Sequence, residues 1–427
     1  MSRPLKHICM ATDIPFWLGS TGAEQRMLAL VDFLSQPPFQ LSVFFLGQCQ
    51  GADLERIERL PCEVVFFESE KPPESFLRRI RWYAEATRNQ LEKWLKRSNS
   101  DEATASQPEP LKLADYRWPW AIDQFRSHVA RVRPRAIICQ YVTMAYLLEG
   151  LSLADRRHIL CVLDTHDILH DRGMQFHSAG YLHWLEISES EEVEVWNRFD
   201  AVIAIQPQEA ERIRAAVSQP RVIVAGHALR RPLRLAQRAR TAEAECRKVT
   251  VGYIASANYS NWHAINRFLI EVWPDLLELQ GIEVELLVAG KICDWFNLVV
   301  GRAESLLKSR VRLQGPVERL EDFYSKIDVA INPVQFGTGL KIKNVEAVAF
   351  GKPLVSTASG AAGMSSTVLA CCLVAEDYSQ MSTQLREICG SAERLEEMTS
   401  AAEEVAKSEF SPQKIFAELS ALLANLD

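Results

Sequence analysis

Short apolar runs alternate with amphipathic stretches along most of this chain. Runs such as 136–140 and 329–333 have the length and the Val, Ile and Ala content of buried strands. The stretches between them have the apolar spacing of helices. Because repeated strand–helix units build parallel sheets, the alternation predicts an α/β protein.

The expected strands fall into two groups of similar size. In the first half we expect strands at 7–12, 40–47, 63–67, 136–140, 159–165, 201–205 and 221–225. In the second half we expect them at 249–256, 284–289, 311–314, 329–333, 353–357 and 372–375. A chain of 427 residues is too long for one hydrophobic core. We predict an N-terminal domain at 1–235 and a C-terminal domain at 245–408. The segment 229–248 is expected to connect them, and a last helix is expected at 409–427.

One segment, 68–120, interrupts the alternation. Its part 75–97 combines basic residues with Trp82 and Trp94, and the polar stretch 98–110 has the composition of a flexible loop. A basic aromatic helix can lie on an anionic membrane surface. It can also be a helical insertion that packs on its own domain and extends its basic groups into solvent. The second is the more ordinary role.

The segment 329–357 is the most informative one for function. It has the pattern of a buried strand, a glycine turn, a helix and a second buried strand. A glycine turn that opens a helix presents unpaired N–H groups and the positive end of the helix dipole, which suit a phosphate. Lys341 and Lys343 add positive charge there, and Glu346, further into the helix, can accept hydrogen bonds from ribose hydroxyls. Phosphate and diol together indicate a nucleotide.

The same turn also has a purely structural interpretation. Gly337, Thr338 and Gly339 can form an ordinary tight connection between strand and helix. However, two lysines at the start of a helix are unfavourable to its dipole unless an anion is bound. This local conflict favours a binding site over packing alone.

The run Gly-Thr-Gly-Leu-Lys-Ile-Lys-Asn-Val-Glu-Ala at 337–347, followed by Gly-Lys-Pro-Leu-Val-Ser-Thr at 351–357, resembles the donor-nucleotide motif of family 4 glycosyltransferases. The resemblance implies the GT-B fold, in which two Rossmann-like domains face each other across a cleft and the last helix crosses back to the N-terminal domain. It also implies a nucleotide-sugar donor on the C-terminal domain, an acceptor on the N-terminal one, retention of anomeric configuration, and no metal or other cofactor.

By this resemblance Glu346 would hold the ribose and Lys341 the diphosphate leaving group, with Lys343 beside it. The donor-binding residues implied in the turn itself are Gly337, Thr338, Gly339 and Leu340. Many members of the family carry a glutamate at the position of Thr338, where it contacts the donor sugar. This chain lacks that carboxylate, as the Gly-x-Gly-x-(Arg/Lys)-x-Lys branch of the family commonly does.

The loop after the first strand contains Gly19 and Gly22, which let a ligand come close to the backbone, and a helix is expected from about Ala23. The loop is not the Gly-x-Gly-x-x-Gly of dinucleotide-binding folds, which argues against an NAD-dependent oxidoreductase. It resembles the N-terminal glycine-rich loop of family 4 enzymes, which lies under the donor phosphates and sugar. A plain loop is the alternative.

His166 and Asp167 follow the expected strand 159–165, at the edge where open α/β sheets bind ligands. A lone histidine is usually structural, but this one stands with Asp164, Asp167 and Arg172. In the family, a similar segment borders the cleft and its histidine contacts the transferred sugar. We therefore predict His166 as a catalytic residue, with Asp164 and Asp167 as neighbours or orienters; a structural role is the alternative. Lys341 and Asp167 complete the predicted catalytic residues.

Three residues after strands of the second half complete the predicted donor site. Ser256 and Asn258 can either donate hydrogen bonds to the diphosphate or cap the following helix. Lys291 can reach the phosphates or lie on the surface.

In the first half, the acidic run 186–194 is typical of a solvated helix face.

Composition limits partners and location. The net charge of −7 gives no reason to expect nucleic acid. No apolar run approaches the ~20 residues that cross a bilayer, and the N-terminus lacks the apolar region of a signal peptide. The ten cysteines include no Cys-x-x-Cys pair, which favours a reducing cytoplasm. No group of residues has the spacing of a metal site. We expect a cytoplasmic protein, with peripheral contact to the inner membrane face through 75–97 as the open alternative.

These observations predict a glycosyltransferase that moves a sugar from a nucleotide diphosphate donor to an acceptor hydroxyl. The acceptor is a glycan, a lipid-linked glycan or a protein, as in polysaccharide or glycoconjugate biosynthesis. The alternative is a catalytically silent GT-B protein that binds a nucleotide or serves as a scaffold. Thr338 favours this alternative, whereas Lys341 and Glu346 oppose it.

Overall fold

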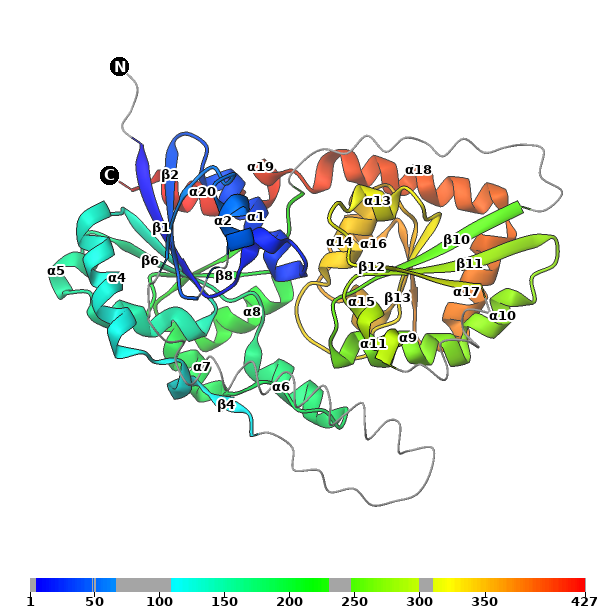
Figure 1. Cartoon of the computed structure of the whole chain (residues 1–427), viewed down its shortest axis with the longest axis horizontal. Helices are drawn as coiled ribbons and strands as arrows, with labels where there is room; N and C mark the ends of the chain where they lie inside the picture. Colours follow the sequence, from blue (N-terminus) through cyan, green and yellow to red (C-terminus); the bar gives the residue numbers. More distant parts are fainter. Residues whose placement is uncertain are drawn as a thin grey trace.

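The computed structural model describes residues 5–47, 49, 51–66, 109–229, 247–298 and 310–426. The expected membrane-contacting stretch 75–97 lies outside these residues, as do most of the insertion 68–120 and most of the connection 229–248. The described residues form two lobes, each built on a parallel sheet (Figure 1). Among them, no helix is both long and apolar enough to cross a membrane.

The N-terminal lobe contains a seven-stranded parallel sheet with the order β3-β2-β1-β5-β6-β8-β9. Its strands are β1 (Lys6–Thr12), β2 (Phe39–Phe45), β3 (Glu63–Phe66), β5 (Ala136–Gln140), β6 (Leu160–Asp164), β8 (Ala201–Ala204) and β9 (Arg221–Val224). Its helices are α1 (Gly22–Leu34), α2 (Gly51–Ile57), α4 (Pro119–Val132), α5 (Leu153–Arg156), α6 (Leu169–Ser178), α7 (Glu189–Trp196) and α8 (Pro207–Ala216). Three 3₁₀ turns accompany them at Phe16–Leu18, Leu113–Tyr116 and Val142–Gly150.

The C-terminal lobe contains a six-stranded parallel sheet with the order β12-β11-β10-β13-β14-β15. Its strands are β10 (Arg247–Ile254), β11 (Ile282–Ala289), β12 (Val311–Gly315), β13 (Val329–Asn332), β14 (Leu354–Thr357) and β15 (Cys372–Ala375). Its helices are α9 (Tyr259–Glu271), α10 (Trp273–Leu277), α11 (Ile292–Leu298), α13 (Glu321–Tyr324), α14 (Ile342–Ala349), α15 (Ala358–Ala361), α16 (Ser366–Leu369), α17 (Tyr378–Gly390) and α18 (Ala392–Glu409).

The thirteen strands of the two sheets confirm the thirteen expected ones, each within two residues at either end. A further two-stranded parallel ribbon, β4 (Leu111–Lys112) with β7 (Leu185–Glu186), was not expected. Strands of two residues are too short to show an alternating pattern, so sequence carries no signal for them.

In each sheet, the second and third strands along the chain lie on one side of the first strand and the later strands lie on its other side. The strand order therefore reverses between β1 and β5 and between β10 and β13. In open α/β sheets, ligands bind at such a switch point, outside the carboxyl ends of the strands. The loops after β1 and β5 and those after β10 and β13 line one cleft between the lobes. The topology therefore places two switch points opposite each other.

Each lobe contributes side chains to the other. The last helices, α19 (Pro412–Ile415) and α20 (Ala417–Ala424), follow α18 across to the N-terminal lobe (Figure 1). There Phe416, Leu419 and Leu423 are buried in the core on one face of the N-terminal sheet. In the opposite direction, Phe176 of α6 joins the core of the C-terminal lobe. The two cores are thus tied together at two places.

Candidate functional site

The cleft between the lobes has a volume of about 610 Å³. Its walls are loops that follow strands of both sheets, with loops 13–26 and 166–184 on one side and 334–346 on the other. All the predicted site residues line it: Gly19, Gly22, His166, Asp167, Ser256, Asn258, Lys291, Gly337, Thr338, Gly339, Leu340, Lys341, Lys343 and Glu346. The structure brings these residues together, and their individual roles stay predictions.

The glycine-rich loop is shaped largely by its own side chains. Gly19 has a left-handed backbone with φ 59°, and its carbonyl accepts from Gln25 Nε2 at 2.6 Å. Glu24 accepts the N–H groups of Ser20 and Thr21, as part of the capping box that starts α1. A Cβ atom on Gly22 would lie 2.9 Å from the Ile342 side chain. Gly22 therefore allows α1 to meet α14 across the cleft.

The Gly-Thr-Gly turn is held from the opposite lobe. Gly337 and Gly339 have φ values of 113° and 76°, which non-glycine residues rarely adopt. The Gly337 N–H donates to Gln175 Oε1 of α6 at 2.8 Å, and the Gly339 N–H donates to Glu209 Oε1 of α8 at 3.1 Å. Two N–H groups that the sequence offers to a phosphate are thus bound by the N-terminal lobe in this structure.

Lys341 folds back under the turn that precedes it. Its Nζ donates to the carbonyl oxygens of Gly337, Thr338 and Gly339 at 2.8, 2.8 and 2.9 Å. Burial lowers the pKa of its ammonium group to about 8, although the charge of Asp167 opposes this shift. The ammonium group therefore fixes the shape of the turn and places a positive charge directly beneath it.

Lys343 points toward the first turn of the C-terminal lobe. Its Nζ donates to Asn261 Oδ1 at 2.6 Å and lies 4.7 Å from the centre of the Tyr253 ring. Burial, followed by the charge of Lys341, lowers its pKa to about 7. Asn258 caps α9 by accepting from Asn261 N at 2.9 Å, and its Nδ2 donates to Ser256 Oγ at 3.2 Å. Asn258 thus caps the helix, and both Asn258 and Ser256 line the cleft.

Glu346 lines the cleft and is 5% exposed. Tyr324 donates its hydroxyl to Glu346 Oε2 at 3.4 Å, and His227 Nε2 is 3.9 Å from Oε1. Burial raises the pKa of the carboxyl group to about 8, against the hydrogen bond from Tyr324. At neutral pH this group is therefore mostly protonated, and it can both donate and accept a hydrogen bond.

His166 is held in an unusual conformation at the end of β6. The backbone φ is 58° at His166 and 64° at Tyr141, values that non-glycine residues rarely adopt. The two rings stack, with 4.4 Å between their centroids. His166 Nε2 is 2.5 Å from Gln140 Oε1. Burial lowers the pKa of His166 to about 4, so the ring is neutral. Because Gln140 Oε1 only accepts, the proton is on Nε2, and Nδ1 is left as an acceptor for a hydroxyl group.

The aspartates beside His166 have different partners. Asp164 forms a fully buried ion pair with Arg26 Nη1 at 2.6 Å, and Arg26 also donates to Ala225 O and Gly226 O. Asp164 and Arg26 therefore connect α1 to the end of β6 and to the residues that follow β9. Asp167 lies in the cleft wall and accepts from Arg172 Nη1 at 2.8 Å through Oδ2.

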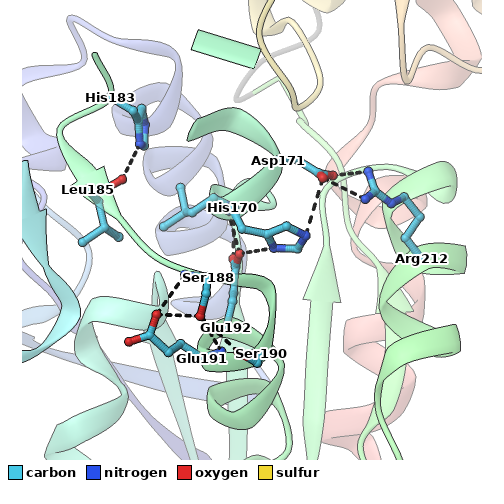
Figure 2. Close-up of polar contacts among 10 residues, drawn as sticks. His170, Asp171, His183, Leu185, Ser188, Ser190, Glu191, Glu192 and Arg212 are labelled. Carbon is cyan, nitrogen blue, oxygen red and sulfur yellow. Dashed lines mark hydrogen bonds and ion pairs between the residues drawn. The ribbon is translucent and has the colours of Figure 1, made fainter. Parts of the chain in front are cut away.

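The prediction for the acidic run 186–194 is wrong at Glu192, which is fully buried. Glu192 accepts the N–H groups of Leu169 and His170 at 3.0 and 2.8 Å, so it caps α6 from the neighbouring helix α7. It also lies 2.7 Å from His170 Nδ1 (Figure 2). The sequence did indicate that Glu192 is buried. Val195 and Trp196 follow it by three and four residues, which puts all three side chains on one face of α7.

Sequence reasoning also missed Glu209, which is 4% exposed and touches the Gly-Thr-Gly turn. Burial, followed by the charge of Asp167, raises the pKa of its carboxyl group to about 8. Its position one turn before Ile213 on the inner face of α8 indicated burial, but no local pattern indicated contact with the other lobe.

Residues 248–390 match the family model described as Glycosyl transferases group 1. The matched residues lie within the C-terminal lobe. A comparison of the sequence with curated proteins finds no match.

The whole chain resembles solved glycosyltransferase structures. Sucrose-phosphate synthase from Thermosynechococcus elongatus is 13% identical, with 99% of each chain covered and a TM-score of 0.65. Anabaena HepE, solved with UDP and glucose, is 14% identical, with 99% of this chain and 100% of that chain covered and a TM-score of 0.62. TarM of S. aureus is 9% identical, with 98% of each chain covered and a TM-score of 0.65. These likenesses confirm the predicted GT-B fold, and the assignment to family 4 stays a prediction.

Proposed function

We propose that this protein transfers a sugar from a nucleotide diphosphate sugar to an acceptor hydroxyl in the cleft between its lobes. The observation that carries the proposal is the meeting of two lysines and a buried glutamate, at the start of one helix, with His166 and Asp167 of the opposite lobe. The match of residues 248–390 to the Glycosyl transferases group 1 model supports the same function. HepE, which has the same fold, was solved with UDP and glucose and with UDP-glucose.

The donor diphosphate binds at the start of α14. The N–H groups of the first helical turn and the positive end of the dipole meet an anion there. Burial lowers the pKa of Lys341 to about 8 and that of Lys343 to about 7. The negative groups around these two ammonium groups therefore do not offset the cost of burying them. A diphosphate supplies the negative charge that offsets this cost. Glu346, one turn further along α14, accepts the ribose hydroxyls.

The transfer step depends on stabilising the charge that develops on the departing diphosphate, which fixed positive groups in a dry cleft do effectively. Lys341 and Lys343 provide this stabilisation without a metal ion. The neutral His166 ring accepts a hydrogen bond from a hydroxyl of the transferred sugar. The acceptor enters from the N-terminal lobe, and the anomeric configuration is retained. The acceptor is a glycan, a lipid-linked glycan or a protein within polysaccharide or glycoconjugate synthesis.

The test is to incubate the purified full chain with a panel of nucleotide sugars, with and without glycan acceptors, and to measure released nucleotide diphosphate by chromatography. Release of nucleotide diphosphate from one donor supports transfer if Lys343→Met abolishes it. The control is Lys407→Met, at an exposed position, which should keep the release. Tight donor binding without release under any condition supports the silent, nucleotide-binding alternative. Absence of any nucleotide binding contradicts both.

A further inference from the structure

His227 is a buried histidine, 3% exposed, whose ring has no hydrogen-bond partner among the described residues. Both ring nitrogens, Nδ1 and Nε2, are in this condition. A neutral imidazole carries one nitrogen that donates and one that accepts, so neither capacity is used. Buried polar groups in folded proteins nearly always have a partner. We therefore expect the ring to interact with a polar group that lies close to it.

The nearest such group is the carboxyl group of Glu346. His227 Nε2 lies 3.9 Å from Glu346 Oε1. The other oxygen, Oε2, accepts from the Tyr324 hydroxyl at 3.4 Å, so Oε1 is the oxygen that faces His227. A hydrogen bond between nitrogen and oxygen spans about 2.7–3.2 Å, and an approach of about 1 Å therefore joins the two groups.

His227 belongs to the segment 225–229, which follows β9 and leads from the N-terminal lobe to the C-terminal one. At its start, Arg26 of α1 donates to the carbonyl oxygens of two successive residues. At its end, Leu229 packs against the core of the C-terminal lobe. The segment is thus attached to both lobes. His227 therefore approaches Glu346, on α14, from the part of the chain that passes between them.

The protonation of the two groups suits a hydrogen bond. Burial, followed by the charge of Arg26, lowers the pKa of His227 to about 3, so the ring is neutral. Burial raises the pKa of Glu346 to about 8, so the carboxyl group is mostly protonated at neutral pH. The carboxyl O–H can then donate to Nε2, which accepts through its lone pair. One proton is enough for the pair.

Ribose hydroxyls change where this proton lies. A carboxyl group that receives two hydroxyl donors accepts best as a carboxylate, which has two accepting oxygens and no proton. The carboxyl O–H bond then breaks and an N–H bond forms on Nε2. The product is a carboxylate beside an imidazolium ring, and hydrogen bonds to a charged acceptor are stronger than neutral ones. The total charge of the pair does not change.

Resting on the proposed function, we propose that His227 is a positioning residue of the nucleotide site, which hydrogen-bonds Glu346 and orients its carboxyl group toward the ribose hydroxyls. Glu346 is among the described residues that line the cleft and His227 is not, so His227 acts through Glu346 and does not touch the nucleotide. Discrimination between ribose and deoxyribose then depends on the segment between the lobes as well as on α14.

The test is titration calorimetry of the full chain with UDP, GDP and ADP and with their 2′,3′-dideoxy analogues. For the diphosphate that binds, we expect His227→Phe to weaken binding of the ribonucleotide about tenfold and to leave the dideoxy analogue within about twofold. His227→Gln, whose amide can donate to Oε1, should keep the ribonucleotide within about threefold of the wild type. His158→Phe, at an exposed position, is the matched control and should change neither.

A double variant separates action through Glu346 from a general structural effect. In the Glu346→Ala background, His227→Phe should cause no further loss of affinity. Circular dichroism and thermal unfolding confirm that each variant is folded, and His227→Ala replaces His227→Phe if the larger ring prevents folding. Equal loss for ribonucleotide and dideoxy analogue, no loss for either, or a further loss in Glu346→Ala overturns the role of His227 and leaves the proposed function standing. Failure of every nucleoside diphosphate to bind the wild type overturns the proposed function itself.

Discussion

Burial sets the charge of individual residues in the cleft and beside it. It lowers the pKa of Lys341 to about 8 and that of Lys343 to about 7. It raises the pKa of Glu209 and of Glu346 to about 8. Below pH 7 all four groups are therefore mostly protonated, and above pH 8 they are mostly deprotonated. The cleft is more positive by several charges on the acidic side of this window than on its basic side.

This titration predicts how donor binding depends on pH. A bound diphosphate favours the protonated form of each of the four groups, so affinity is highest below pH 7 and falls as the pH rises through 7 to 8. His166, with its pKa lowered to about 4, adds no inflection near 6.5. The measurement is calorimetric titration with a nucleotide sugar, whose phosphates keep the same charge over this range. Proton uptake on binding, seen in buffers of different ionisation enthalpy, is the second expected result, and affinity that rises with pH contradicts the assignment.

Glu346 offers a second prediction for a single side chain. Glu346→Ala should weaken binding of the nucleoside diphosphate by ~1–3 kcal/mol, because hydrogen bonds to the ribose are lost. The same variant should no longer distinguish a ribose from a 2′,3′-dideoxyribose. Titration calorimetry measures both effects, and the exposed Glu404→Ala on α18 serves as the control. An unchanged dissociation constant would remove Glu346 from the nucleotide site.

Among the elements, helix α6 depends most clearly on its neighbours. Glu192 of α7 caps its first turn, and Arg212 of α8 forms an ion pair with Asp171 at 2.8 Å (Figure 2). Burial alone would lower the pKa of His170, but the hydrogen bond and charge of Glu192 raise it above its ordinary value. Because α6 starts directly after His166 and Asp167, these contacts also position the candidate catalytic loop.

Glu192→Ala should therefore destabilise the protein by about 3–5 kcal/mol, since it leaves the buried N–H groups of Leu169 and His170 and the His170 ring without their acceptor. The exposed Glu189→Ala on the same helix should cost less than about 0.5 kcal/mol. Urea unfolding followed by circular dichroism measures both values. His170 has a raised pKa, so its pairing with Glu192 stabilises the fold below the unfolded pKa and loses this effect as the pH rises through the folded value. The difference between wild type and Glu192→Gln should narrow over the same rise, and a constant difference would show that His170 is not charged.

For the whole molecule, aromatic packing holds the lobes together beside the cleft. The Tyr181 ring stacks on Tyr259 and on Phe336, with centroid distances of 5.3 and 5.4 Å. Its hydroxyl lies 3.1 Å from His263 Nδ1. Together with Gln175, Phe176 and Glu209, these contacts join the N-terminal lobe to the Gly-Thr-Gly turn. The structure describes the lobes in contact, which is the arrangement that completes the site.

Tyr181→Ala should shift the population toward separated lobes. Aromatic pairs contribute about 0.5–1.5 kcal/mol each beyond their buried area, so the loss of two pairs weakens the contact between lobes by about 1–3 kcal/mol. Small-angle X-ray scattering should show a larger radius of gyration than for the wild type, which a nucleotide sugar reduces again. Met174→Ala, at an exposed position of α6, is the control. An unchanged radius in Tyr181→Ala would show that other contacts keep the lobes together.

Local patterns in the sequence determined the strands and the residues gathered in the cleft. Apolar runs such as 329–333 and turn residues such as Gly337 and Gly339 act through neighbours close in the chain, so period and turn chemistry reveal them directly. The same patterns indicated two parallel sheets, and the predicted site residues lie in the loops and helix starts that follow strands of those sheets.

Only the tertiary structure decided which polar groups face one another. Glu209 meets Gly339 across 130 positions of sequence, and Gln175 meets Gly337 across 162. Glu192 belongs to an acidic run that resembles a solvated face, yet its carboxylate caps another helix in the core. Such contacts, and the pKa shifts that follow from them, depend on how two lobes and their helices pack. No local pattern encodes that packing, because the interacting groups come close only after the chain has folded.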